Sequence, residues 1–227
     1  MRSSLFAQNN TEEQSETLLF GALLTIIGGF IETYSYVGRG HVFANGQTGN
    51  MAHLGMCLAA ADWPGTIKYA TPIICFAIGV YFAEVIMNFC KQRPAHTGKQ
   101  AVLLTEVLLV LVTAAVPVGE LNIISNITIA LICGLQMEAF RKIRTYSYNS
   151  TMCTGNLRSA TEALYKFFHL QHPEESTKAL HYYGVILIFI ASGAVGGAAT
   201  SLFGGAAILL CLIPIGICLF MLSFTRQ

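Results

Sequence analysis

The sequence predicts an all-α membrane protein: a polytopic helix bundle of six spanning helices and two short half-membrane or interfacial helices, built as an inverted repeat. Three observations predict this fold. Of the 227 residues, 54% are hydrophobic and 11% are charged, whereas a soluble domain averages about 25% charged residues. Several apolar runs are long enough to cross a bilayer, and one motif recurs at a constant offset.

The six predicted spans follow from length, because a helix crosses the hydrocarbon core in about 20 residues. They are Leu18–Val37, Tyr69–Phe89, Ala101–Val118, Leu121–Phe140, Tyr182–Phe203 and Ala206–Phe224. Pro117–Glu120 and Gly204–Gly205 predict tight connections between neighbouring spans. Residues 1–17 are polar and predict a disordered cytoplasmic tail, so that a single transmembrane domain occupies residues 18–226.

Two further segments are helical in pattern but short. They are Met51–Ala61 and Leu157–His169, and each follows a Thr-Gly-Asn tripeptide. Eleven helical residues span about 16 Å, roughly half a membrane. The second segment carries a charged stripe of Arg158, Glu162 and Lys166. This stripe favours an interfacial helix, while the short length is also typical of a re-entrant one.

The orientation follows from the lysines and arginines, which are enriched in cytoplasmic loops. With six spans, 11 basic residues lie on the side of both termini, and only Arg39 and Lys68 lie on the other. We therefore predict that both termini are cytoplasmic.

An internal repeat relates Ile26–Asn50 to Ile132–Asn156 at an offset of 106 residues. Six positions are identical in pairs: Ile26/Ile132, Gly28/Gly134, Glu32/Glu138, Thr48/Thr154, Gly49/Gly155 and Asn50/Asn156. The halves, about 18–118 and 121–224, each contain three spans. Because three is odd, the second half is inverted relative to the first. Inverted repeats are common in secondary transporters, whose sites lie at the repeat interface, but channels can be built in the same way.

Glu32 is the leading candidate for chemistry, because a carboxyl inside a span is costly and usually faces a cavity or a partner. It shares a polar stripe with Tyr36 and could carry a proton. The alternative is that Glu32 lies near the outer end of its helix and reaches water. Its repeat partner Glu138 is followed by Arg141 and Lys142, so a surface ion pair explains it equally well.

The two tripeptides, Thr48-Gly49-Asn50 and Thr154-Gly155-Asn156, are the other candidates, together with Gln47. Free N–H groups at a helix N-terminus attract anions and substrate dipoles, although Thr and Asn are also ordinary capping residues. We expect the tripeptides to approach each other near the bilayer middle, with Glu32 bordering the space between them.

Other kinds of site find little support. A net charge of +1 gives no indication of nucleic-acid binding, no His or Cys spacing matches a metal template, and we expect no cofactor. The seven cysteines read as small buried hydrophobic residues. Gly193 and Gly197 favour close helix packing, within the bundle or in a homo-oligomer.

The runs Gly28–Tyr36 and Val42–Asn50 resemble the YoaK-like family, bacterial membrane proteins defined by a domain of unknown function. The resemblance extends over roughly Leu18 to Phe224. Where the family often has Asp, this chain has Glu32, which keeps the charge and adds a methylene. The resemblance implies a bacterial inner (plasma) membrane location and says little about activity.

The sequence therefore predicts a proton-coupled permease for a small polar solute. The solute would contact Glu32, Thr48, Asn50, Thr154 and Asn156. Two alternatives stay open. A structural or sensory membrane protein would satisfy these polar groups internally and leave no cavity. A membrane enzyme would need a nucleophile–base set, and because the sequence offers none, we expect no enzymatic activity.

Overall fold

The computed structural model describes residues 17–94, 96–143, 146–147, 150 and 153–224. Its elements are α1 (Leu18–Gly38), α2 (Gln47–Ala59), α3 (Trp63–Phe89), α4 (His96–Ala115), α5 (Asn122–Ala139), β1 (Lys142–Ile143), β2 (Tyr146–Ser147), α6 (Cys153–His169), α7 (Glu174–Phe203), the 3₁₀ helix η2 (Gly204–Cys211) and α8 (Leu212–Ser223). The two-residue strands pair antiparallel. The predicted tail lies outside the described residues except for Thr17, whose hydroxyl accepts a hydrogen bond from the Phe20 amide at the start of α1.

Five helical stretches in the described part of the chain are long and apolar enough to cross a membrane. Four are α1, α3, α4 and α5, and the fifth is the 50-residue stretch from Glu174 to Ser223. Many large apolar side chains on them are exposed, among them Phe89, Leu187 and Leu202 at 74%, 66% and 77%. Exposure on this scale is expected where lipid covers the surface. The prediction that the chain is a membrane protein built as a helix bundle is therefore confirmed.

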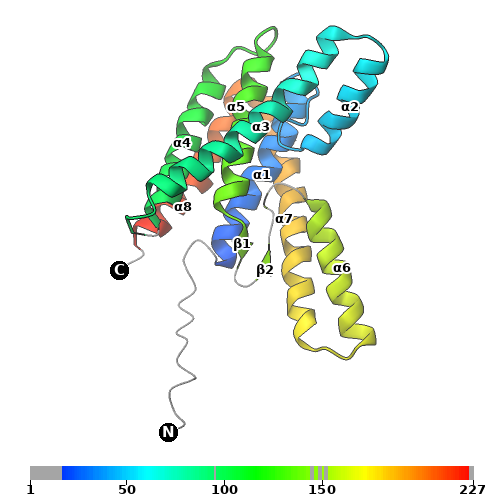
Figure 1. Ribbon diagram of the computed structural model, residues 1–227, viewed down its shortest axis with the longest axis vertical. Coiled ribbons are helices and arrows are strands. Elements are labelled where there is room, and N and C mark those ends of the chain that lie inside the picture. The colour runs from blue at the N-terminus through cyan, green and yellow to red at the C-terminus, as the bar shows by residue number, and fades with distance from the viewer. Residues whose placement is uncertain (1–16, 95, 144–145, 148–149, 151–152, 225–227) are drawn as a thin grey trace.

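The last of the five stretches is divided at Gly204, whose φ of +57° is a conformation that favours glycine. A straight helix of 50 residues would be about 75 Å long, more than twice the hydrocarbon thickness. In Figure 1 the chain passes from α7 to a red α8 that lies on the other flank of the molecule, beside α4.

The most extensive helix packing joins α1 to α7 and α3 to α5. Glycines permit both crossings. A Cβ on Gly29 would collide with Ser192 Oγ and the Phe189 carbonyl of α7, and a Cβ on Gly134 would collide with the Phe76 carbonyl of α3. Gly193 lies against Thr33 of α1, whereas nothing lies within 4 Å of a Cβ placed on Gly197. The predicted Gly193–Gly197 pair therefore contributes only Gly193 to packing within the bundle.

The two short helices form hairpins with the helices that follow them, α2 with α3 and α6 with α7. Figure 1 shows the two hairpins leaving the middle of the molecule in opposite directions, the cyan α2 upward and the yellow-green α6 downward. Both short helices begin four residues earlier than predicted, so that each Thr-Gly-Asn lies in the first helical turn.

Candidate functional site

A cavity of about 260 Å³ lies where the first turns of α2 and α6 meet. Its walls come from α1, from the loop between α1 and α2, and from α2, α6 and α7. The lining residues are Glu32, Phe43, Gly46, Thr48, Gly49, Cys153, Thr154 and Phe189. The structure thus brings residues of both Thr-Gly-Asn segments to one space beside Glu32.

Glu32 projects from the fourth turn of α1 toward the loop before α2. Its carboxylate accepts hydrogen bonds from the backbone amides of Asn45 and Gly46. A Cβ on Gly46 would lie 2.5 Å from Glu32 Oε1, so glycine is needed for this close approach. The second oxygen, Oε2, is buried and has no hydrogen-bond partner among the described residues. The loop before α2 therefore holds one side of the Glu32 carboxylate, while Oε2 has no partner among the described residues.

The loop before α2 is folded into the protein by its own polar side chains. The Asn45 side chain donates to the Gly28 carbonyl at 3.2 Å, and Cys133 Sγ donates to the Asn45 carbonyl at 3.1 Å. Gln47 donates to the Ala44 carbonyl at 2.8 Å. These contacts anchor the loop to α1 and α5, so that the backbone amides facing Glu32 are fixed in place.

Asn50 is buried and donates to the Phe43 carbonyl and to Gln47 Oε1, each at 3.0 Å. Asn50 and Gln47 therefore stabilise the loop and do not line the cavity. The capping alternative is wrong for α2, because its N-cap is Gly46, which makes no side-chain hydrogen bond. Thr48, in the first turn, lines the cavity instead.

The second tripeptide contributes only in part. Thr154 lines the cavity, Gly155 is exposed with open space around it, and Asn156 is buried in α6. Cys153, directly before the tripeptide, completes this wall.

Two predicted candidates lie away from the cavity. Glu138 forms an ion pair with Arg141, which also contacts Glu84 at 3.2 Å, so the surface-pair alternative describes Glu138. Tyr36 does not line the cavity either, but its ring stacks on Phe43 with centroids 4.4 Å apart. The Tyr36 ring therefore packs against Phe43, which lines the cavity.

The sequence reasoning missed Phe43, Gly46, Cys153 and Phe189 as lining residues. Phe43 and Gly46 lie inside the run that carries the family resemblance, so that run contained the signal for them. Cys153 precedes a repeated tripeptide and was treated as a bland hydrophobic residue. Phe189 lies in an apolar span and carries no sequence signal, because only the crossing of α1 and α7 brings it to the site.

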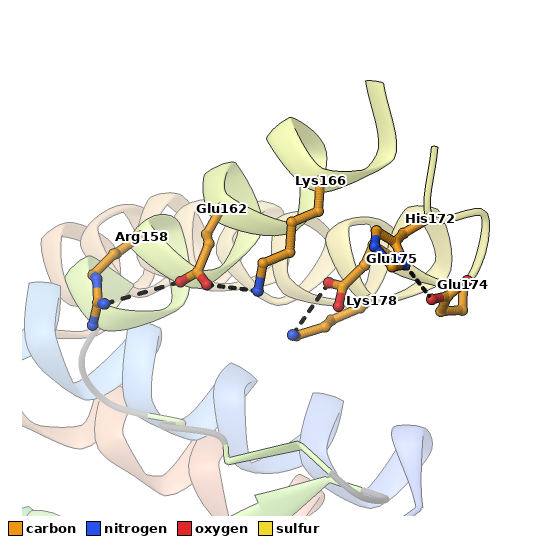
Figure 2. A network of polar contacts seen from close by, with 7 residues as sticks. All are labelled: Arg158, Glu162, Lys166, His172, Glu174, Glu175 and Lys178. Atoms are coloured by element: carbon orange, nitrogen blue, oxygen red, sulfur yellow. Dashed lines mark hydrogen bonds and ion pairs between the residues drawn. The ribbon is translucent and has the colours of Figure 1, made fainter. Parts of the chain in front are cut away.

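A row of charges covers the α6–α7 hairpin (Figure 2). Along α6, Glu162 Oε1 accepts a hydrogen bond from Lys166 at 2.8 Å, and Arg158 lies 3.9 Å from Glu162. Along α7, Lys178 pairs with Glu175 at 3.2 Å. The hydrogen bond and charge of Lys166 lower the pKa of Glu162, and Glu162 raises that of Lys166. This charged surface needs water or lipid headgroups around it.

The fold and the cavity define a polytopic α-helical membrane protein with a polar site between two short helices. The chain belongs to the family described as protein of unknown function DUF1275, which matches residues 20–221. It is similar to the UPF0700 transmembrane protein YoaK of Bacillus subtilis (strain 168), with 28% identity over 148 residues. The match covers 62% of this chain and 64% of that protein, so it spans less than two thirds of the relative. No solved structure matches the chain. The predicted YoaK-like membership is confirmed.

Proposed function

We propose that this protein is a permease of the bacterial inner membrane, which binds a small polar solute in the cavity beside Glu32 and carries a proton on that carboxyl. One observation carries the proposal: two short helices from different halves of the chain begin at the same cavity, beside a carboxyl whose Oε2 has no hydrogen-bond partner among the described residues. Secondary transporters place their sites where short or broken helices meet at a repeat interface.

The packing supports the inverted repeat in this proposal. Each half has the order span, short helix, span, span: α1 to α4 in the first, and α5, α6, α7 and η2–α8 in the second. In both halves the first helix packs most extensively on the third helix of the other half, α1 on α7 and α5 on α3. A two-fold axis in the membrane plane would exchange these pairs. Gly29 and Gly134 make the close approach in each, and Gly29 is the neighbour of the aligned Gly28.

Six crossings with both termini in the cytoplasm also belong to this proposal. The break at Gly204 supports a sixth crossing, because it divides the 50-residue stretch into two helical segments. Arg39, one of only two basic residues assigned to the outer side, is fully buried. Lys68 is then the only basic side chain left to an outer surface, which strengthens the charge asymmetry used for orientation.

A structural or sensory protein without transport would satisfy its buried polar groups internally. The cavity favours a solute instead, and so does Glu32 Oε2, for which the described part of the chain offers no hydrogen-bond partner. The fixed backbone amides around Glu32 would hold the carboxyl in one position as its protonation and its partners change.

The test begins with a thermal-shift screen of small solutes on purified protein, because a ligand of the folded state raises its stability by mass action. Hits are then measured for uptake into proteoliposomes with and without a pH gradient. Thr48→Val and Thr154→Val, which remove a hydroxyl from each side of the cavity, should weaken both readouts. Glu138→Gln, which changes the aligned carboxyl outside the cavity, should leave them unchanged. The permease proposal would be refuted if the solute bound both threonine variants as tightly as the unmodified chain, or if no solute were taken up.

A further inference from the structure

The helix N-termini at the cavity contribute positive charge. The first turns of α2 and α6 both face it, through Thr48 and Gly49 on one side and Cys153 and Thr154 on the other. The first N–H groups of a helix lack partners within the helix, and each N-terminus carries about half a positive charge. No Lys, Arg or His is among the described lining residues.

Glu32 is the one carboxyl among the described residues that line the cavity. When it is ionised, it is itself the anion at the N-terminus of α2, held by the amides of Asn45 and Gly46. When it is protonated, the positive ends of the two helices lose that compensation, and Glu32 gains an O–H that can donate. The buried Oε2, which has no partner among the described residues, is the atom available for this.

We propose that the cavity binds a small monocarboxylate together with one proton, which resides on Glu32. This inference rests on the proposed solute site and names its substrate class. No covalent bond changes: a proton from solution joins the Glu32 carboxylate, and the incoming carboxylate takes its place in the field of the helix N-termini. The proton and the carboxylate together carry no net charge, so their binding does not add charge to the low-dielectric interior.

The walls of the cavity fit this class. The hydroxyls of Thr48 and Thr154 can donate to carboxylate oxygens, while Phe43 and Phe189 offer apolar surface to a short carbon chain. A volume of about 260 Å³ has room for a short-chain carboxylate.

Cys153 is the other titratable side chain among the described lining residues. Burial, followed by the charge of Glu32, raises the pKa of its thiol to about 11. The thiol is therefore neutral over the range from pH 5 to pH 9, and proton uptake in that range reports on Glu32.

The test uses three probes of nearly the same shape: propionate, propionamide and propylammonium. Calorimetry of the purified full chain, repeated in buffers of different ionisation enthalpy, measures both affinity and protons taken up. We expect propionate to bind at least tenfold more tightly than the other two at pH 5, with uptake of one proton where Glu32 is ionised. In that range its Kd should rise about tenfold per pH unit, as one coupled proton requires.

Glu32→Gln should bind propionate without proton uptake and without the pH dependence, while Glu138→Gln should behave as the unmodified chain. Preference for propylammonium or propionamide, or propionate binding without proton uptake in the unmodified chain, would overturn the monocarboxylate assignment. If Glu32→Gln does not fold, the proton uptake of the unmodified chain by itself tests the monocarboxylate assignment. Binding of none of the three probes also overturns the assignment, while the wider solute screen decides the permease proposal separately.

Discussion

Arg39 donates to the hydroxyl of Tyr34 twice, from Nε at 2.9 Å and from Nη2 at 2.7 Å, and both side chains are fully buried. The Tyr34 hydroxyl in turn donates to the Gly205 carbonyl at 2.9 Å. The remaining Arg39 bonds go to the Thr113, Val116 and Pro117 carbonyls at the C-terminus of α4. The Arg39 guanidinium interacts favourably with the negative C-terminal end of α4 and, with Tyr34, connects α1 to α4 and η2.

Arg39→Met should lower the stability of the protein by about 2–4 kcal/mol, because it leaves buried carbonyls and a tyrosine hydroxyl without partners. Melting of the purified protein in detergent, followed by intrinsic fluorescence, measures the change. Arg141→Met, at an exposed ion pair with Glu84, is the matched control and should have a small effect. Equal losses for the two variants would show that the Arg39 contacts contribute no more than a surface pair.

Gly29→Ala and Gly134→Ala should each lower the melting temperature, because the added Cβ collides with backbone or side-chain atoms of α7 and α3 respectively. Gly184→Ala and Gly216→Ala place the same methyl where nothing lies within 4 Å. These controls should be neutral or stabilising by up to about 1 kcal/mol, the helix propensity gain. Similar losses at Gly29 and Gly134 would agree with two equivalent crossings, and a neutral result at either would contradict the packing described.

The topology predicts opposite accessibility for two exposed connections. In a chain with the half-buried Cys57, Cys75 and Cys153 replaced by Ser, Arg93→Cys should react only with a reagent that reaches the cytoplasm. Glu120→Cys should react from the outside. Labelling of intact cells with a membrane-impermeant maleimide distinguishes them. Reaction of both positions from one side would refute the six-span arrangement, and the inverted repeat with it.

Glu162→Gln should loosen the start of the α6–α7 hairpin slightly and in a pH-dependent way. The pKa of Glu162 is lowered from 4.5, so its contribution is present above that value and is lost as pH falls through the folded pKa. The pKa of Lys166 is raised from 10.5, so its contribution is present below that value and is lost as pH rises through the folded pKa. The variant should differ most from the unmodified chain between these limits. Hydrogen exchange of α6 amides at pH 7, in low and high salt, measures the effect, and a difference that salt does not reduce would contradict an exposed pair.

Glu106 in α4 is fully buried, and neither carboxyl oxygen has a hydrogen-bond partner among the described residues. Glu106→Met keeps the length of the side chain and removes the unsatisfied group, so it should raise stability by about 1–3 kcal/mol. Glu84→Met, at the surface pair with Arg141, should be close to neutral. A less stable Glu106→Met protein would mean that the carboxyl has a partner or a role that its surroundings do not reveal.

Much of the fold could be predicted because hydropathy acts locally. A run such as Leu121–Phe140 partitions into lipid whatever its neighbours do, and the structure places α5 at Asn122–Ala139. The sequence predicts that the short helix begins at Met51, after Thr48-Gly49-Asn50, whereas α2 begins at Gln47. There the side chains of Gln47 and Asn50 stabilise the helix start through the loop, a contact pattern that propensity does not contain.

By itself the sequence determined the membrane class, the apolar helices, the family and the short list that contains Glu32, Thr48 and Thr154. These depend on composition, run length and repeated residues, which are properties of the chain alone. Only the tertiary structure decided that Thr48 and Thr154 share a cavity with Glu32 and that Phe189 also lines it. It also decided that Glu138 pairs with Arg141 away from this cavity and that Arg39 is buried. Each depends on how closely helices cross, and crossings such as that of Gly29 with α7 are set by packing between segments some 160 residues apart.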